Sequence, residues 1–535
     1  MKTTLRNLTV TWPLAVCLLL PALAHAETVV QAWAQRYNGP ENGISAAKAM
    51  AVDGSNNVVV TGYSSGSGGD YDYATIKYSA AGVPLWTNRY NGPLNTNDQA
   101  TAVAVDGNGD VVVTGYSTGS IHPPYPNPFT DYATIKYSSA GVPLWTNRYH
   151  GPGNANDGAT AVAVDASNNV IVTGYSASNS FGYPFTDFAT IKYSSAGIPL
   201  WTNRYNGPAG TVDQANAVAV DGSNNVIVAG FSTGTNFTGR HYTTIKYSSA
   251  GIPLWTNRYN GSGNMGQDEV IALAVDSSNN VIATGYASNE TSYDYATIKY
   301  SSAGLELWSN LYNGPANGQD WANAVATDSS NKVIVTGFSD NGGGDWDYAT
   351  VKYSSEGIPL WTNRYNGPGN GADDPVAVAV EASGNVIVAG LSVGSGSGVD
   401  YLMIKYSSAG VPLWTNRYNG PGNTDDYAMT MAQDHSGNII LTGYAIDSGG
   451  AGSFLTVKYI CVPSPVITHF QPTNGVFQMR VDEVLQPGTL VIEASADLAV
   501  WAPVFTNTTP TNVLFYTDPE AGNNLTRFYR AFQSP

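Results

Sequence analysis

Hydrophobic and polar residues alternate along most of the chain in short runs that return at a regular interval. One interval holds a small apolar run that ends in an acid, a Val-rich run that ends in Gly-Tyr, a run that ends in Ile-Lys-Tyr, and a run built around Trp, as in residues 102–106, 111–116, 132–137 and 144–149. Gly, Asn and Ser fill the links between runs, which is typical of hairpin turns. The pattern predicts four short antiparallel strands per interval, named a to d.

The interval occurs eight times. The acids that end strand a are Asp53, Asp106, Asp165, Asp221, Asp276, Asp328, Glu381 and Asp434. The lysines near the end of strand c are Lys77, Lys136, Lys192, Lys246, Lys299, Lys352, Lys405 and Lys458. The tryptophans of strand d recur every 53 to 59 residues, at Trp33, Trp86, Trp145, Trp201, Trp255, Trp308, Trp361 and Trp414. Four strands repeated at this period indicate β-propeller blades, and no stretch after residue 26 has a helical period, so we expect an all-β protein.

The two ends of the repeat predict how the ring closes. The first strand d, Trp33 to Tyr37, has no strand c before it, and the last strand c, Phe454 to Tyr459, has no strand d after it. We expect these two segments to pair, which closes an eight-bladed propeller and covers an exposed strand edge. The expected organisation is a targeting segment at 1–26, the propeller at 27–462 and a small β-sandwich at 463–535.

The first 26 residues resemble a targeting signal. Lys2 and Arg6 precede an apolar run, and Ala24-His25-Ala26 has the small-x-small form of a cleavage site. The pattern predicts a secreted protein, extracellular or periplasmic, with attachment to the cell surface left open. No later apolar run has the length of a membrane span. Cleavage after residue 26 removes two basic residues and no acidic one, which takes the net charge from −17 to −19. An acidic surface argues against nucleic acid as a partner.

The repeat unit AVAVDxSNNVIVTGYS…DYATIKYSSAGVPLWTNRY resembles that of bacterial extracellular β-propeller proteins of the SBBP type. Gly82 lies four residues before Trp86, and Gly141 four before Trp145, a spacing that resembles the tryptophan-docking motif of quinoprotein propellers. That resemblance implies that each Trp packs between blades. The vicinal cysteine pair of the quinoprotein enzymes is missing, so their cofactor is not expected. After residue 463, Ser-x-Asp-Leu-x-x-Trp and Arg-Phe-Tyr-Arg resemble C-terminal modules of secreted proteins from Verrucomicrobia-like bacteria.

Two sets of aspartates recur in the loops on one face of the predicted ring. Seven lie eight residues before the strand-a acid: Asp98, Asp157, Asp213, Asp268, Asp320, Asp373 and Asp426. A second set precedes strand c: Asp72, Asp131, Asp187, Asp294, Asp347 and Asp400. A carboxylate-rich face could bind Ca²⁺, the one cofactor that the sequence suggests. Capping of loop backbone by the Asp side chains is the favoured interpretation, because nearly every blade repeats it. The histidines show no pair at ligand spacing, which argues against zinc.

The b–c loops vary most between units and share a face with the d–a loops. Candidate ligand contacts there are His122, Tyr125, Phe129, Phe181, Tyr183, Phe185, Arg240, His241 and Trp321. Aromatic side chains suit sugar rings or partner side chains, although long loops also pack on themselves. Glu269 and Asp374 break the repeat pattern on the same face.

These observations favour a secreted, non-catalytic propeller scaffold that binds a glycan or protein ligand on the face of the b–c and d–a loops. One alternative is an extracellular carbohydrate-active hydrolase or lyase that uses the symmetry-breaking acids and histidine. Another is a cell-surface or matrix protein attached through its C-terminal module. No catalytic residue is assigned, because the Gly-x-Ser-x-Gly segments, such as residues 62–66, end strands rather than form the strand-to-helix turn of hydrolases.

Overall fold

The computed structural model describes residues 28–66, 68–120, 129–153, 155–178, 185–235, 239–261, 266–289, 291–447, 449–462, 466–473, 476–482, 489–495, 500, 502–508, 513–518 and 528–534. All its named elements are β-strands. The chain forms two compact units, one covering Gln31–Tyr459 and the other taking in the chain from Ile460 onward. Within the described residues no helix has the length and hydropathy needed to cross a membrane.

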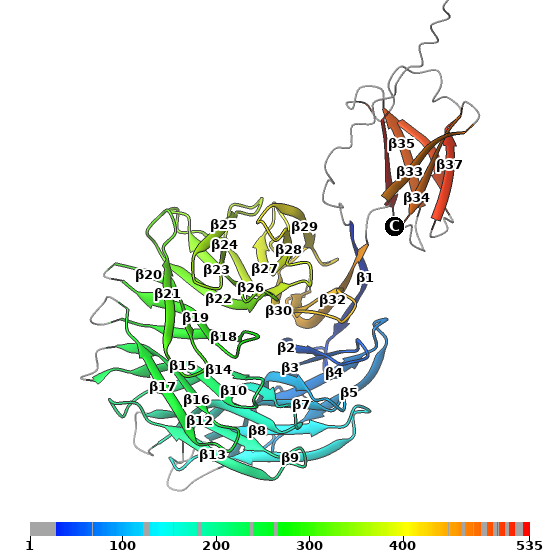
Figure 1. Ribbon diagram of the computed structural model, residues 1–535. Coiled ribbons are helices and arrows are strands. Elements are labelled where there is room, and N and C mark those ends of the chain that lie inside the picture. The colour runs from blue at the N-terminus through cyan, green and yellow to red at the C-terminus, as the bar shows by residue number, and fades with distance from the viewer. Residues whose placement is uncertain are drawn as a thin grey trace, which may run out of the picture. The chain divides into compact units, whose positions relative to one another are not determined.

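Eight four-stranded sheets make up the first unit, and Figure 1 shows them arranged around one axis. Blade 1 has β2 (Ser45–Val52), β3 (Val58–Ser65), β4 (Tyr71–Tyr78) and β5 (Pro84–Tyr90), and blade 2 has β6 (Asp98–Val105), β7 (Val111–Ser120), β8 (Phe129–Tyr137) and β9 (Pro143–Tyr149). Blade 3 has β10 (Asp157–Val164), β11 (Val170–Ala177), β12 (Thr186–Tyr193) and β13 (Pro199–Tyr205), and blade 4 has β14 (Asp213–Val220), β15 (Val226–Thr233), β16 (Arg240–Tyr247) and β17 (Pro253–Tyr259). Blade 5 has β18 (Glu269–Val275), β19 (Val281–Ser288), β20 (Tyr293–Tyr300) and β21 (Glu306–Tyr312), and blade 6 has β22 (Asp320–Thr327), β23 (Val333–Asp340), β24 (Trp346–Tyr353) and β25 (Pro359–Tyr365). Blade 7 has β26 (Asp373–Val380), β27 (Val386–Val393), β28 (Val399–Tyr406) and β29 (Pro412–Tyr418).

Blade 8 closes the ring with strands from both ends of the repeat. It consists of β30 (Asp426–Gln433), β31 (Ile439–Ile446), β32 (Gly452–Val462) and, as its outer strand, β1 (Thr28–Tyr37). Figure 1 shows the blue β1 beside the orange β32. The Tyr37 and Phe454 rings meet edge to face at 5.6 Å. The predicted all-β, eight-bladed propeller closed by an N-terminal strand is confirmed.

The inner strands begin earlier than the apolar pattern indicates. Strand β6 starts at Asp98 rather than at Ala102, and a β-bulge lies between Ala100 and Ala102 in its pairing with β7. A bulge shifts the side-chain alternation by one residue. The residues of the strand that precede the bulge therefore do not follow the apolar pattern of the residues after it. Each inner strand contacts the inner strands of both neighbouring blades, and β30 contacts β2.

The outer-strand tryptophans join each blade to the next. The Trp86 Nε1 atom lies 3.1 Å from the Ser139 carbonyl oxygen of blade 2. The indole ring packs on Gly141, whose φ of +84° favours glycine and whose Cβ, if present, would lie 2.7 Å from Trp86 Cγ. The same packing occurs at Trp33, Trp145, Trp201, Trp255, Trp308 and Trp361. The inter-blade role that the resemblance implied for these tryptophans is therefore present.

Buried ion pairs support the face of the a–b and c–d turns. In blade 2, Lys136 Nζ lies 2.6 Å from Asp106 Oδ2, with both side chains almost fully buried. In blade 1, Lys77 pairs with Asp53 at 2.8 Å and also donates to the Ser139 carbonyl of the next blade at 3.2 Å. Every blade repeats this pair between its strand-c lysine and its strand-a acid. The most regular charged residues of the repeat are therefore structural.

The chain after the propeller forms two three-stranded sheets. One contains β33 (Val466–Thr473), β34 (Val476–Asp482) and β37 (Val513–Asp518), and the other β35 (Thr489–Ser495), β36 (Ala502–Asn507) and β38 (Phe528–Ser534). Met479 and Val481 from the first sheet share a buried core with Leu490 and Ile492 from the second. The resemblance of this segment to a known type of secreted module stays a prediction.

Candidate binding site on the variable face

We call the face that carries the b–c and d–a loops the variable face, and the residue seven positions before each strand-a acid a rim position. The rim positions, in blade order, are Ala46, Gln99, Gly158, Gln214, Glu269, Trp321, Asp374 and Tyr427. Strands c and d are nearly the same in most blades, yet no two consecutive rim positions carry the same residue. Three consecutive blades place Glu269, Trp321 and Asp374 at equivalent positions.

Glu269 is held by side chains from blades 4 and 5. Its Oε1 atom accepts a hydrogen bond from Asn216 Nδ2 at 2.9 Å. Its Oε2 atom pairs with Arg240 at 3.0 Å and accepts the Tyr286 hydroxyl at 2.9 Å. The Arg240 guanidinium also lies 4.0 Å from the centre of the Phe231 ring, a cation–π contact. The Glu269 side chain is 13% exposed and that of Arg240 40%, so the guanidinium is the accessible member of the pair.

An aromatic row continues from Glu269 along blades 5 and 6. The Tyr286 and Trp321 rings stack at 4.3 Å with an 18° angle between their planes. Trp321 lies 5.4 Å from Phe338, which stacks on Trp346 at 4.6 Å. Trp346 is 37% exposed and ends the row, whereas Phe338 and Tyr286 are buried. The Trp321 Nε1 atom is buried and has no hydrogen-bond acceptor among the residues that the structure describes.

Asp374 in blade 7, like Glu269 in blade 5, accepts a hydrogen bond from an asparagine of the preceding blade. Asn323 Nδ2 of the preceding blade donates to Asp374 Oδ1 at 2.7 Å and to the Pro375 carbonyl at 3.0 Å. Burial raises the pKa of Asp374 to about 7, against the opposing effect of the Asn323 hydrogen bond. In blades 2 and 3 the residue equivalent to Asn323 is Thr101 or Thr160, which bonds backbone carbonyls only. Asparagine thus replaces threonine where the next blade carries a rim acid.

Only part of the predicted ligand set joins this network. Arg240 and Trp321 meet through Glu269 and Tyr286, whereas His122, Tyr125, Phe181 and Tyr183 lie outside the described residues. Phe129 and Phe185 are half-buried in blades 2 and 3.

His241 occupies the position that most blades give to an aspartate that binds the strand-d arginine. Its Nε2 atom is buried without a partner in the described part of the chain. Burial and the Arg258 charge lower the pKa of His241, with Asp268 opposing them. Arg258 bonds instead to Ser232 and to the Thr233 carbonyl. These effects favour the neutral form of the imidazole, which lies among groups that serve loop structure.

The seven calcium candidates lie one in each of blades 2 to 8, at or just before the first residue of the inner strand, and all are buried. Each accepts the backbone N–H of a loop glycine, as in the 2.5 Å bond from Gly92 N to Asp98 Oδ2. Burial raises the pKa of Asp98, as it does for the other six. These bonds are those of loop capping, and binding of Ca²⁺ stays a prediction.

Several residues of the network were not singled out from the sequence. They are Asn216, Tyr286, Asn323, Phe338 and Trp346. Comparison of the eight units position by position would show Asn216 and Asn323 as departures from the threonine of blades 2 and 3. Tyr286 and Phe338 carry no such signal, because an aromatic residue occupies their position in most blades.

Comparisons with known proteins give likenesses at low sequence identity. No protein-family model matches the chain. The chain is similar to the uncharacterized WD repeat-containing protein L264 of Acanthamoeba polyphaga mimivirus, with 23% identity over 471 residues. The match takes in 69% of this chain but 31% of that protein, so the chain spans about a third of its relative's length.

Among solved structures, the chain is similar to the polysaccharide lyase Uly1, with a TM-score of 0.42 and 11% identity over 77% of this chain and 89% of that one. It is also similar to an α-L-arabinanase of Penicillium chrysogenum complexed with arabinobiose, with a TM-score of 0.34 and 11% identity over 55% and 91% of the two chains. At these values the likeness concerns the fold alone.

Proposed function

We propose that this chain is an exported, non-catalytic propeller that binds a glycan on the variable face, across the rim positions of blades 5 to 7. The observation that carries the proposal is the order of three rim residues in consecutive blades. Blade 6 has the aromatic ring of Trp321, and the blades before and after it have the carboxyl groups of Glu269 and Asp374. The targeting segment expected at residues 1–26 supports export.

The chemistry of the rim favours a sugar. A sugar ring offers an apolar face to an aromatic side chain and hydroxyl groups to charged acceptors, and hydrogen bonds to charged groups are the stronger kind. The Asn216 and Asn323 contacts orient the two carboxylates before any ligand arrives, which reduces the entropy lost on binding. Exposed Trp346 extends the aromatic surface of the rim.

A protein ligand is less well supported by the surface. Protein interfaces need a contiguous apolar core within a polar rim. The exposed large apolar residues of the propeller lie mainly in the c–d turns and outer strands, as at Val83, Leu85, Val142 and Leu144. Those segments repeat in nearly every blade and lie away from the rim positions.

A carbohydrate-active enzyme is a second candidate, favoured by Asp374. A carboxyl group with a pKa of about 7 can donate or accept a proton near neutral pH, as a general acid or base must. Asp374 would supply that group in a hydrolase or lyase, with Glu269 as the second carboxylate. Release of reducing ends or unsaturated products by the wild-type chain, and its loss in Asp374→Asn, would favour this candidate.

A glycan array probed with the full chain tests the proposal. Trp321→Gln places at the blade 6 rim the residue that blades 2 and 4 carry, so it should fold. We expect glycans bound by the wild type to be lost in Trp321→Gln and kept in the control Gln99→Ala, which alters the blade 2 rim. Absence of any bound glycan, or equal binding by the Trp321 variant, would contradict the proposal.

A further inference from the structure

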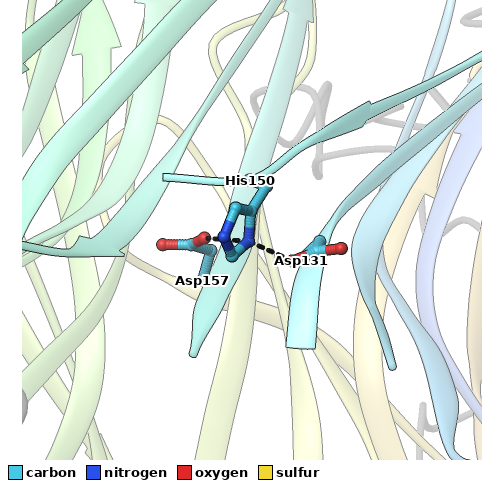
Figure 2. A group of neighbouring side chains, drawn as sticks. All are labelled: Asp131, His150 and Asp157. Carbon is cyan, nitrogen blue, oxygen red and sulfur yellow. Dashed lines mark hydrogen bonds and ion pairs between the residues drawn. The ribbon is translucent and has the colours of Figure 1, made fainter. Parts of the chain in front are cut away.

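A histidine lies between two buried carboxylates at the junction of blades 2 and 3, away from the rim of blades 5 to 7. Figure 2 shows His150 with Asp131 on one side and Asp157 on the other. His150 Nδ1 is 2.9 Å from Asp131 Oδ1 and 3.8 Å from Asp157 Oδ2. One potential ligand atom from each of the three residues lies within 4.8 Å of the other two.

The carboxylate pair is a feature of the repeat, but the histidine is not. At five other junctions the same two aspartates flank an asparagine: Asp72, Asn91 and Asp98; Asp187, Asn206 and Asp213; Asp294, Asn313 and Asp320; Asp347, Asn366 and Asp373; Asp400, Asn419 and Asp426. In each, burial raises the pKa of the second aspartate and the charge of the first adds to that rise. At the blade 2–3 junction, His150 instead lowers the pKa of Asp157, after burial has raised it.

Surrounding groups orient the two carboxylates. Arg148 bonds Asp131 Oδ2 at 2.7 Å, which leaves Oδ1 directed at the imidazole. Asp157 accepts backbone N–H groups at both oxygens, from Gly151 at 2.7 Å and Ala177 at 2.9 Å. Outer partners of this kind fix ligand geometry in metal sites. The His150 side chain is 31% exposed, so an ion and a water ligand can reach the group from solvent.

We propose that Asp131, His150 and Asp157 bind one divalent transition-metal ion, with Zn²⁺ the best match. Imidazole nitrogen and carboxylate oxygen are zinc ligands, whereas Ca²⁺ takes oxygen ligands alone. Tetrahedral Zn²⁺ with bonds of about 2.0–2.2 Å places its ligand atoms about 3.3–3.6 Å apart, between the two distances from His150. The metal replaces the proton that His150 and Asp131 share, and solvent completes its coordination. The ligands come from three separate segments, so spacing along the sequence did not reveal them.

The charge of the group is suited to a dication. Two carboxylates and the Arg148 guanidinium leave a net charge of −1 beside the imidazole in its neutral, metal-binding form, and a divalent ion takes the total to +1. The competing account is a protonated His150 that only bridges the two aspartates. The two accounts differ in what they predict for added metal: the first requires a saturable site, and the second requires none.

Titration calorimetry of the metal-stripped full chain with Zn²⁺, with Co²⁺ absorption as a second readout, tests the proposal. The matched variant is His150→Asn, which recreates the residue of the five other junctions and so preserves the fold. We expect one equivalent of Zn²⁺ in the wild type, at least about 100-fold weaker binding in the variant, and a visible Co²⁺ ligand-field band in the wild type alone. Absence of that equivalent in the wild type, or equal affinity in His150→Asn, would overturn the proposal.

Discussion

Trp33 and Lys458 share one acceptor, the carbonyl oxygen of Ala80. The Trp33 Nε1 atom and the Lys458 Nζ atom each lie 3.1 Å from it. One donor comes from β1 and the other from β32, so both ends of the repeat hold the c–d turn of blade 1. The ring is closed by these bonds and by the pairing of β1 with β32, with no covalent link among the described residues.

Loss of this closure should destabilise the whole propeller. Trp33→Ala removes the packing on Gly82 and the bond to Ala80, at an expected cost of about 2–4 kcal/mol for a half-buried indole. Deletion of residues 27 to 40 should lower the melting temperature further, because it exposes the edge of β32. Differential scanning calorimetry measures both. An unchanged melting temperature in the deletion would mean that β1 does not close the ring.

The buried ion pairs should be costly to break from the lysine side. Lys136→Met leaves Asp106 buried without its cation, and such a loss typically costs about 3–5 kcal/mol. Denaturant unfolding measures the change. The control is Lys332→Met, because Lys332 lies in the a–b turn outside the strand-c lysine set. Similar unfolding midpoints for the two variants would show that the buried pair contributes little.

The blade count and the ring closure could be predicted because the repeat displays them many times. The eight tryptophans give the period, and the incomplete units at Trp33 and Phe454 identify the paired ends. The ion pairs were not predicted, although Asp106 and Lys136 were both recognised as hallmarks. Their contact depends on the side-chain directions at the ends of two strands that are not neighbours in the sheet, which the apolar pattern does not contain.

The candidate site was only partly predictable, because it depends on which blades are neighbours and which side chains face the rim. Trp321 and Arg240 were selected as departures from the repeat, but Tyr286, which contacts both Glu269 and Trp321, matches the repeat. The sequence also does not reveal that His150 lies between Asp131 and Asp157, because the a-strand register and the loop fold set that contact.

Restoring the repeat residue at His241 should stabilise blade 4. In blade 3, Arg204 pairs with Asp187 at 2.7 Å, whereas Arg258 of blade 4 has the half-buried His241 in that place. His241→Asp gives Arg258 a carboxylate, with an expected gain of about 1 kcal/mol after repulsion from Asp268. The reverse change, Asp187→His, should destabilise blade 3. Urea unfolding of both variants is the measurement, and a loss of stability in His241→Asp would contradict this account.

Asp374 should make stability decrease as the pH rises toward neutrality. Its folded pKa of about 7 lies above the usual value of about 3.9 for an unfolded Asp, so the folded chain holds the proton more tightly. The stabilisation is complete below about pH 4 and is lost as the pH passes through about 7. Asp374→Asn should therefore flatten the change in urea midpoint between about pH 5.5 and 7.5. Identical pH profiles for the variant and the wild type would exclude this role.

The rim residues that depart from the repeat, rather than the repeat itself, should bind the ligand. The direct test is calorimetric titration of an array-identified glycan into the wild type and into a triple variant, Glu269→Gln, Trp321→Gln and Asp374→Gln. Glutamine is the rim residue of blades 2 and 4, so the variant makes blades 5 to 7 like them. We expect at least about a 100-fold loss of affinity, about 2.7 kcal/mol, in a variant that still unfolds in one cooperative transition. Equal affinity in the wild type and the triple variant would contradict the claim.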